Sequence, residues 1–407
     1  MGVRDADLVA VYVNKSVVFM RLLASAAMSS TKTMIHQLRI RPRRVPATLI
    51  VLALLLGAPI VQSDAGEGPT RQELERLIND AAQKSSCIGL AIGVKSGQTV
   101  ATGFLGTTGN NGAPTADTEF EIGSITKTFT TTLLAWADQQ GRMRLNEPLA
   151  KFALWRIPHW QGEPIRLVHL ADHTSGLPRQ MPSLPPRLMP EDVWAFLARY
   201  QLTRPPGAQY AYSNVGVNAL GLAIERAHRA SLEQLYAQVI AGPLGMTDTA
   251  MQLTDAQHAR LALGFTADRQ RASEFTPGFP FVGGASALRS TLRDMMRYLA
   301  FELGEGRSPL DSLLPVLHQP RHPADQGNVG LGWNIRTLGN GIQVVWKDGL
   351  MPGYSSYINF APSSRTGSVV LANQARCGVP PVAAELITRL NGLVPDPAEP
   401  VPSSGDD

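Results

Sequence analysis

The sequence has little of several features that would assign it to a simple class. It has only 2 cysteines in 407 residues, which excludes a scaffold held together by disulfides. Hydrophobic residues make up 44% and charged residues 17%, a balance that excludes an intrinsically disordered chain. No apolar run reaches the roughly 18 residues that a membrane span requires. We therefore expect an enzyme-sized globular protein.

The excess of positive charge lies in the first 65 residues. The net charge is +4 overall, and this segment holds 8 Lys and Arg against 3 acidic residues. The remainder has 29 basic and 30 acidic residues, so it is close to neutral. Because a neutral body offers no electrostatic footprint for a polyanion, we expect no nucleic-acid partner.

Residues 1–65 are predicted to be a leader that contains a signal peptide. Four arginines at 39–44 precede an apolar run at 47–61, and small or polar residues follow it. This order is typical of a secretory signal, with Met34 as the expected true start. The alternative is a permanent anchor, which the short run and Pro59 disfavour. We expect export to the periplasm or the outside and at most a peripheral association with membrane.

The two cysteines leave two possibilities open. Cys87 begins an apolar, strand-like run at 87–94, and Cys377 follows another at 368–373. If these strands are antiparallel neighbours, the start of one lies beside the end of the other, within reach of a disulfide. The alternative is a pair of free thiols, because nothing in the sequence determines the pairing.

Local patterns predict one folded domain over residues 66–393 and a flexible tail at 394–407. Helical periodicity is found at 70–83, 124–140, 288–303 and 382–390. Strand patterns are found at 88–94, 99–106, 341–346, 354–360 and 368–371.

The order of these elements predicts an α/β protein of the α+β type. Two strands near the start and three near the end indicate a mostly antiparallel five-stranded sheet that is built from both chain ends and flanked by helices. The sheet part would span about 66–123 and 255–393, and about 124–254 would form a helical region beside it.

Ser124 and Lys127 form an SxxK motif at a predicted helix start. Positions i and i+3 share a helix face, so the lysine amine can approach the serine hydroxyl. A serine is a weak nucleophile until a base removes its proton, and a desolvated lysine with a lowered pKa can be that base. Alone the motif is weak, since Ser29 and Lys32 have the same spacing.

Two further motifs follow in order along the chain. Tyr212 and Asn214 form a YxN motif in a predicted loop, and residues 347–349 read Lys-Asp-Gly at the end of a predicted strand. The order SxxK, YxN, KxG is much harder to obtain by chance than any single match. It predicts that the three segments converge on the Ser124 hydroxyl.

With these motifs the sequence resembles the penicillin-recognising serine hydrolases, in the branch of class C β-lactamases and D-alanyl-D-alanine peptidases. Flanking segments such as EIGSITKTFT, PPGAQYAYSN and GPLGMTDT support the resemblance, and LVHLADHTSGLPRQMP is most similar to carboxypeptidase/endopeptidases of the AmpH type. The resemblance implies a β-lactamase/transpeptidase-like fold, a covalent acyl-enzyme, and a peptidoglycan peptide or a β-lactam as substrate. We expect a monomer with no cofactor.

The resemblance also implies the catalytic roles. Ser124 would be acylated, Lys127 would take its proton, and Tyr212 would relay a proton to the leaving amine. The oxyanion would lie between the backbone N–H groups of Ser124 and Leu350.

The remaining motif residues are implied to bind the substrate. Asn214 would hydrogen-bond to Lys127 and to the substrate amide, and Lys347 would face the substrate carboxylate. Gly349 would leave room for the substrate to approach the strand.

Asp348 departs from the family pattern, which usually has Thr or Ser at this position. An ionised Asp348 would repel a substrate carboxylate unless it points away or pairs with Lys347. This departure keeps an esterase of the same fold as an alternative, and a non-catalytic wall-binding protein is a second one.

A metal site is the remaining alternative. His169 and His173 have HxxxH spacing with Asp172 beside them, which suits a zinc pair on a helix. The segment turns at 175–176 and no third ligand is evident, so we expect no metal.

Overall fold

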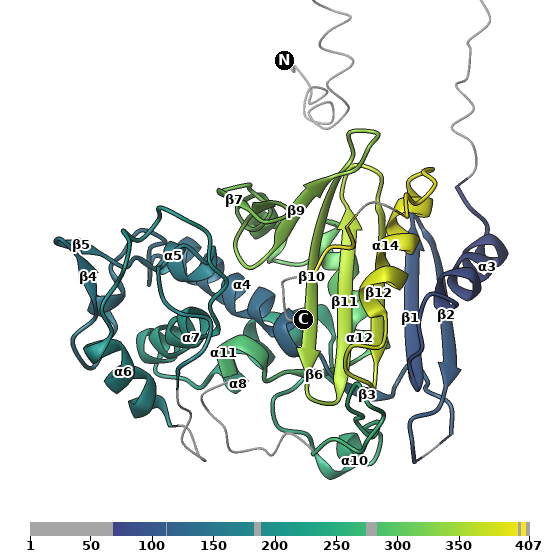
Figure 1. Ribbon diagram of the computed structural model, residues 1–407, viewed down its shortest axis with the longest axis horizontal. Helices are drawn as coiled ribbons and strands as arrows, with labels where there is room; N and C mark the ends of the chain where they lie inside the picture. The colour runs from purple at the N-terminus through teal and green to yellow at the C-terminus, as the bar shows by residue number, and fades with distance from the viewer. Residues whose placement is uncertain (1–67, 111, 183–188, 274–282, 398–399, 404–407) are drawn as a thin grey trace, which may run out of the picture. The chain divides into compact units, whose positions relative to one another are not determined.

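The computed structural model describes residues 68–403, apart from 111, 183–188, 274–282 and 398–399 (Figure 1). The predicted leader at 1–65 and its start at Met34 lie outside the described residues and stay predictions. Within the described ranges, no helix is both long and apolar enough to cross a membrane.

The main sheet of the described chain has eight strands in the order β2-β1-β12-β11-β10-β9-β8-β7 (Figure 1). All neighbouring strands pair antiparallel. The strands are β1 Gly89–Ser96, β2 Thr99–Gly106, β7 His322–Ala324, β8 Gly327–Val329, β9 Asn334–Thr337, β10 Gln343–Met351, β11 Tyr354–Ala361 and β12 Thr366–Ala372. The pairing of β1 with β12 joins the two ends of the chain, which confirms an antiparallel sheet built from both ends.

The predicted count of five strands is wrong. The three missed strands, β7 to β9, have only 3 or 4 residues each. A segment this short is too brief to show alternation of polar and apolar residues, and its pairing is decided by the neighbouring hairpin.

Helices cover both faces of the sheet. On one face, α3 (Arg71–Ala82) and α14 (Val379–Leu390) pack against alternate residues of β1, including Leu90 and Ile92. On the other face lies α12 (Leu292–Glu302), so close to β1 that a Cβ on Gly93 would meet Met296 Sδ at 2.4 Å. Residues are buried along nearly the whole length of β1, β11 and β12, because both faces of the sheet are covered.

The helical region contains most of the remaining elements. They are β4 His159–Trp160, β5 Glu163–Pro164, α5 Leu167–Ala171, α6 Pro190–Arg199, α7 Asn214–His228, α8 Leu232–Leu235, the π-helical turn η3 Tyr236–Ala241 and α9 Gly242–Leu244. Helix α4 (Thr126–Gln139) lies between this region and the sheet (Figure 1). Its threonines are buried and bonded, as when Thr130 Oγ1 donates to the Gly284 carbonyl at 2.6 Å.

The remaining elements of the described chain are short. They are β3 Glu119–Glu121, η1 Gly123–Ile125, η2 Leu149–Lys151, α10 Asp255–His258, α11 Gly283–Ser286, β6 Arg289–Thr291, η5 Asp311–Leu313 and α13 Leu314–Leu317. The predicted helix at 288–303 begins later than expected because its first residues form β6, which pairs with β3. Thr291 then caps α12 by accepting a hydrogen bond from the Asp294 N–H.

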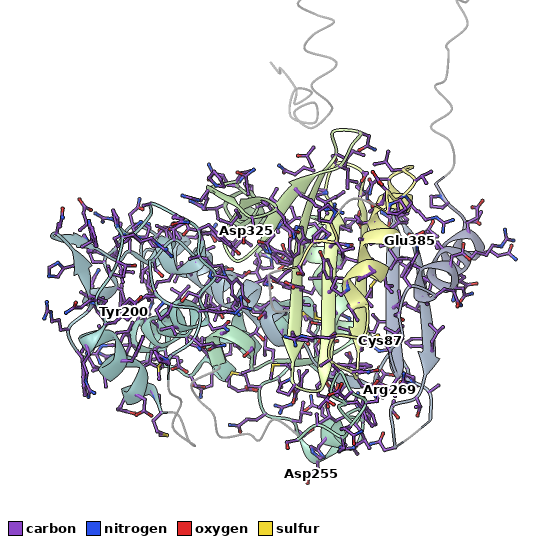
Figure 2. The ribbon with its side chains drawn as sticks, viewed as in Figure 1. Cys87, Tyr200, Asp255, Arg269, Asp325 and Glu385 are labelled. Atoms are coloured by element: carbon purple, nitrogen blue, oxygen red, sulfur yellow. A yellow bond between two sulfur atoms is a disulfide. The ribbon has the colours of Figure 1, made fainter. Side chains whose placement is uncertain are left out.

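The two cysteines form a disulfide that joins Cys87 to Cys377, with their Cα atoms 4.8 Å apart. Cys87 lies on the sheet side of the structure, away from Tyr200 in the helical region (Figure 2). The bond follows from the antiparallel pairing of β1 and β12, which sets the start of one strand beside the end of the other.

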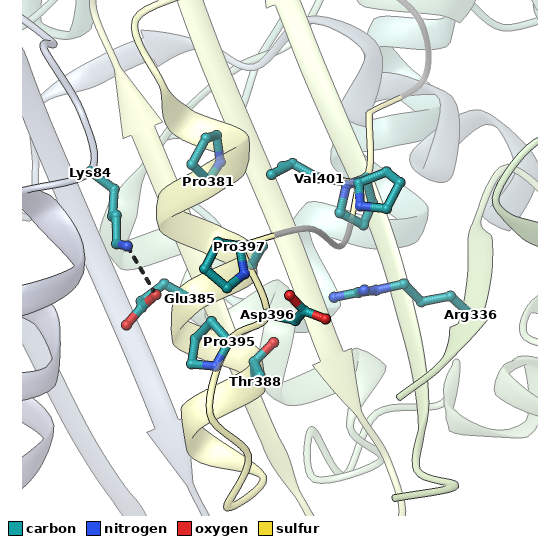
Figure 3. A pocket seen from close by; sticks show the side chains of 12 residues that line it. Lys84, Arg336, Pro381, Glu385, Thr388, Pro395, Asp396, Pro397 and Val401 are labelled. Atoms are coloured by element: carbon teal, nitrogen blue, oxygen red, sulfur yellow. Dashed lines mark ion pairs between the residues drawn. The ribbon is translucent and has the colours of Figure 1, made fainter. Parts of the chain in front are cut away.

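The described part of the tail lies against the sheet and α14. The Tyr357 hydroxyl donates to the Pro402 carbonyl at 3.0 Å. Figure 3 shows Pro395, Pro397 and Val401 around a pocket that the Lys84–Glu385 ion pair borders, with 3.8 Å between its charged atoms. These contacts hold the described tail residues at the surface of the domain, while the flexibility of 394–407 stays a prediction.

Candidate active site

Ser124 lies on a tight turn that presses against β10. Gly123 has φ of +50°, and a Cβ there would come within 2.9 Å of the Leu350 nitrogen. A Cβ on Gly349 would lie 2.1 Å from the Ile122 carbonyl oxygen, which also accepts a hydrogen bond from Ser356 Oγ at 2.8 Å. Both glycines therefore permit backbone to approach backbone.

This contact explains why residue 349 is a glycine, and the explanation differs from the expected one. The sequence suggested that a side chain at this position would block a substrate. In the structure, the Cβ of any other residue would first collide with the main chain of the Ser124 turn.

Three predicted residues meet at one oxygen atom. Lys127 Nζ donates to Ser124 Oγ at 2.8 Å, and the Tyr212 hydroxyl donates to the same oxygen at 2.8 Å. Lys127 also donates to the Ala285 carbonyl at 2.9 Å. All three side chains are buried. A lysine that loses its proton can accept from the serine hydroxyl in the same geometry, which suits proton removal from Ser124.

Burial changes the basicity of the Lys127 amine. Removal from water lowers the pKa of Lys127 from 10.5 to about 8, while the neighbouring Tyr212 opposes the shift and Lys347 adds to it. A lysine base with a pKa close to neutral is partly deprotonated under mild conditions.

The loop that carries Tyr212 is held by hydrogen bonds with residues 173–179, and two of these bonds use a side chain. The Ser213 N–H donates to His173 Nδ1 at 3.1 Å, and Ser213 Oγ donates to the Pro178 carbonyl at 2.7 Å. The His173 ring packs on the Tyr212 ring with centroids 4.5 Å apart. Burial holds the pKa of His173 well below its usual range, so the ring is neutral and Nδ1 can accept.

His173 therefore belongs to the support of Tyr212. His169 Nδ1 accepts from the Arg166 N–H at 3.2 Å, on the other side of Asp172. Within the described part of the chain, no three or more His, Cys, Asp or Glu residues are grouped as metal ligands. The HxxxH spacing gave no sign that one of its rings would anchor the YxN loop.

Lys347 lies on β10 with its amine 5.3 Å from the Tyr212 ring centroid. The same amine donates to Asp348 Oδ1 at 2.6 Å and to the Asp348 carbonyl at 2.9 Å. Burial lowers the pKa of Lys347, and Asp348 acts against that shift. Asp348 thus pairs with Lys347, one of the two arrangements that avoid repulsion of a substrate carboxylate.

Asn214 begins α7, and its N–H donates to the Arg179 carbonyl at 3.0 Å. Its side-chain oxygen is buried and has no hydrogen-bond partner in the described chain. The bond from Asn214 to Lys127 that the resemblance implies is therefore not formed through this oxygen. A buried acceptor beside Tyr212 is available to a substrate N–H.

Sequence reasoning missed Arg179. Its guanidinium carbon lies 4.9 Å from the Tyr212 ring centroid, and its side chain is half-buried. With Lys127 at 4.9 Å and Lys347 at 5.3 Å from the same centroid, three cationic groups of the described residues lie close to the Tyr212 ring. Its position directly after the segment HTSGLP was the only available signal.

Comparison with known families accounts for this arrangement. The Beta-lactamase family matches residues 74–389, which is more than half of the sequence. The chain belongs to the β-lactamase family. The predictions of a β-lactamase-like fold and of a serine hydrolase are confirmed by this membership and by the relatives below.

Relatives that resemble the chain include a D-alanyl-D-alanine-carboxypeptidase/endopeptidase and β-lactamases. D-alanyl-D-alanine-carboxypeptidase/endopeptidase AmpH of Escherichia coli is 29% identical over 357 residues, which cover 81% of this chain and 91% of that protein. A β-lactamase of Pseudomonas fluorescens is 24% identical and covers 75% and 93%, respectively. The crystal structure of a β-lactamase/D-alanine carboxypeptidase from Yersinia pestis has a TM-score of 0.69 and 25% identity, with 78% and 97% covered.

Proposed function

We propose that this enzyme hydrolyses amide bonds through a covalent acyl-enzyme on Ser124. Its substrates are D-alanyl-D-alanine peptides of peptidoglycan or β-lactams. The observation that carries the proposal is the convergence of Lys127 and Tyr212 on Ser124 Oγ, each at 2.8 Å.

The proposed acylation step starts from neutral Lys127. The amine takes the Ser124 proton as Oγ bonds to the substrate carbonyl carbon, and the oxyanion is stabilised by the N–H groups of Ser124 and Leu350. When the C–N bond breaks, Tyr212 donates a proton to the leaving nitrogen and is reprotonated from Lys127. Water then releases the acyl group by the reverse sequence of proton transfers.

The remaining residues of the site would hold the substrate. Asn214 presents its buried, unpartnered oxygen to the substrate amide N–H. Lys347 and Asp348 lie together at the β10 edge of the site, where the substrate backbone would bind along the strand. The name of the AmpH relative, a D-alanyl-D-alanine-carboxypeptidase/endopeptidase, supports a peptide substrate.

The proposal includes export to the periplasm or the outside. The predicted leader supports it, and a disulfide between Cys87 and Cys377 is compatible with an oxidising compartment. The mass of the mature protein purified from the native host would test it, since a full-length mass contradicts cleavage of a signal peptide.

The test of catalysis is time-resolved intact mass spectrometry of the protein with saturating benzylpenicillin. The expected result is one adduct per chain that peptide mapping places on Ser124, together with release of D-alanine from a D-alanyl-D-alanine peptide. Ser124→Ala should abolish adduct and hydrolysis while the fold remains, because the change removes only the two side-chain hydrogen bonds from Lys127 and Tyr212, at about 1 kcal/mol each. Turnover that persists in Ser124→Ala would remove the nucleophile assignment.

An esterase of the same fold is the second candidate, and the Lys347–Asp348 pair favours it. A carboxylate 2.6 Å from the Lys347 amine offsets the charge that would attract a substrate carboxylate, whereas a neutral ester needs no such charge. Turnover of p-nitrophenyl esters with no penicillin adduct would support this candidate. Failure to process either compound would support the non-catalytic wall-binding alternative.

A further inference from the structure

The cation that the third motif supplies is already engaged within the protein. Lys347 Nζ contacts both the carboxylate and the carbonyl of Asp348, and both side chains are buried. Because the two opposite charges of this ion pair offset each other, a substrate carboxylate placed against Lys347 would gain little net attraction. Electrostatics therefore disfavours Lys347 as the main anchor for an anionic substrate group.

Arg179 supplies a different cation in the same site. Its backbone is held because its carbonyl accepts from the Asn214 N–H at 3.0 Å and the preceding Pro178 carbonyl accepts from Ser213 Oγ at 2.7 Å. Its guanidinium lies over the Tyr212 ring at 4.9 Å. These contacts hold Arg179 beside the residue that hydrogen-bonds to the nucleophile.

The three cations around Tyr212 differ in their access to solvent. Lys127 and Lys347 are fully buried, with 0% and 1% exposure, whereas the Arg179 side chain is half-buried. Of these three groups, Arg179 is the one that an entering substrate can meet first. A guanidinium that stacks on an aromatic ring still directs N–H groups outward in its plane, a geometry that matches the two oxygens of a carboxylate.

We propose that Arg179 is a specificity-determining residue that binds the carboxylate of the substrate. The substrates it selects are acyl donors with a carboxylate near the scissile bond, such as a peptide with a free C-terminus or a penicillin. The inference rests on the proposed acyl-enzyme function and assigns the recognition step to a residue outside the three motifs.

The test compares one acyl donor with and without its carboxylate. Acylation rate constants are measured with benzylpenicillin and with benzylpenicillin methyl ester for the wild type, Arg179→Gln and Arg179→Lys. Arg179→Gln should slow acylation by benzylpenicillin by about 10- to 100-fold, the range for one charged hydrogen-bonded contact, and should change the methyl ester rate by less than about 3-fold. The acylation rate constant of Arg179→Lys with benzylpenicillin should lie between those of the wild type and Arg179→Gln, because lysine keeps the positive charge but lacks the paired N–H donors of the guanidinium. Arg199→Gln, at the exposed end of α6, is the matched control and should change neither rate.

Two results would overturn the proposal. Equal losses for both compounds would mean that Arg179 acts only by positioning Tyr212. Unchanged rates with both would mean that it does not contact the substrate.

A binding measurement separates this proposal from the proposed function. Calorimetry measures the binding of D-alanyl-D-alanine and of its C-terminal amide to two proteins, the Ser124→Ala variant and the double variant Ser124→Ala with Arg179→Gln. A preference for the free acid that disappears with Arg179→Gln supports the role of Arg179 even if no compound acylates Ser124. No preference for the free acid would overturn it.

Discussion

The two sides of the site are built in different ways. On the sheet side, the Ser124 turn lies against β10 by contact of main chain with main chain, through Gly123 and Gly349. On the helical side, the Tyr212 loop is held mostly by hydrogen bonds to the segment that contains His173 and Arg179. The sheet side therefore depends on the absence of side chains, whereas the helical side uses the side chains of His173 and Ser213 in addition to main-chain bonds.

This difference predicts different sensitivities to mutation. A close contact between two main-chain segments has no room for an added atom, because a single extra carbon must displace a strand or a turn. A loop held by several hydrogen bonds can lose one and keep the others. We therefore expect substitutions on the sheet side to have larger effects on acylation than substitutions that support the Tyr212 loop.

The largest effect is expected from Gly349→Ala. The added Cβ would lie 2.1 Å from the Ile122 carbonyl oxygen and 2.4 Å from Ser356 Oγ, so the Ser124 turn must move away from β10. Displacement of the nucleophile by about 1 Å should slow acylation by about 100-fold. Overpacking should also lower the free energy of unfolding by ~1 to 3 kcal/mol. The rate of benzylpenicillin labelling and urea unfolding measure the two effects.

Gly339→Ala is the matched control for that variant. Gly339 lies between β9 and β10, and a Cβ there would have no heavy atom within 4 Å. This variant should acylate at the wild-type rate. If Gly349→Ala behaved in the same way, the backbone contact would not position Ser124.

An intermediate effect is expected from pH, since the amine of Lys127 is the proposed base. Burial lowers its pKa to about 8. Below pH 8 the neutral fraction of the amine therefore increases about tenfold for each unit by which the pH is raised, and above pH 8 it levels off. The acylation rate constant should thus increase about 10-fold between pH 7 and the plateau. Stopped-flow labelling across pH 6 to 10 would check the profile, and a flat profile would show that Lys127 is not the base.

The smallest effect is expected from His173→Ala on the helical side. The change removes the acceptor of the Ser213 N–H and the ring that packs on Tyr212. Loss of one net hydrogen bond of ~1 kcal/mol should lower kcat about 5-fold and leave KM nearly unchanged. His159→Ala, at an exposed histidine on β4, is the control. A loss greater than that of Gly349→Ala would reverse the proposed difference between the two sides.

Much of the fold could be predicted because the long elements carry strong periodic patterns. Helix α3 and strands β1, β2, β11 and β12 lie within a few residues of their expected positions. Strands β7 to β9 were missed because short segments acquire their pairing from neighbours. The choice between a disulfide and free thiols also depended on strand register, which residue types alone do not reveal.

For the site, motif spacing indicated which side chains should meet but not what holds them together. The 2.8 Å contacts of Lys127 and Tyr212 with Ser124 lie where the motifs suggested, although the catalytic roles stay a proposal. The supporting roles of His173 and Arg179 had no signature, since a histidine or arginine in a loop is common and usually solvated.

The sequence alone indicated the family through the resemblance that its three ordered motifs carry. It also determined the two-ended antiparallel sheet and the SxxK pair, because these depend on periodicity and on spacing within one helical turn. Only the tertiary structure decided that Asp348 turns its charge onto Lys347 and that Arg179 stands over Tyr212. The first outcome depends on the directions of two adjacent side chains on β10, and the second depends on a contact between two separate segments. Burial and charge select these directions only after the backbone has folded.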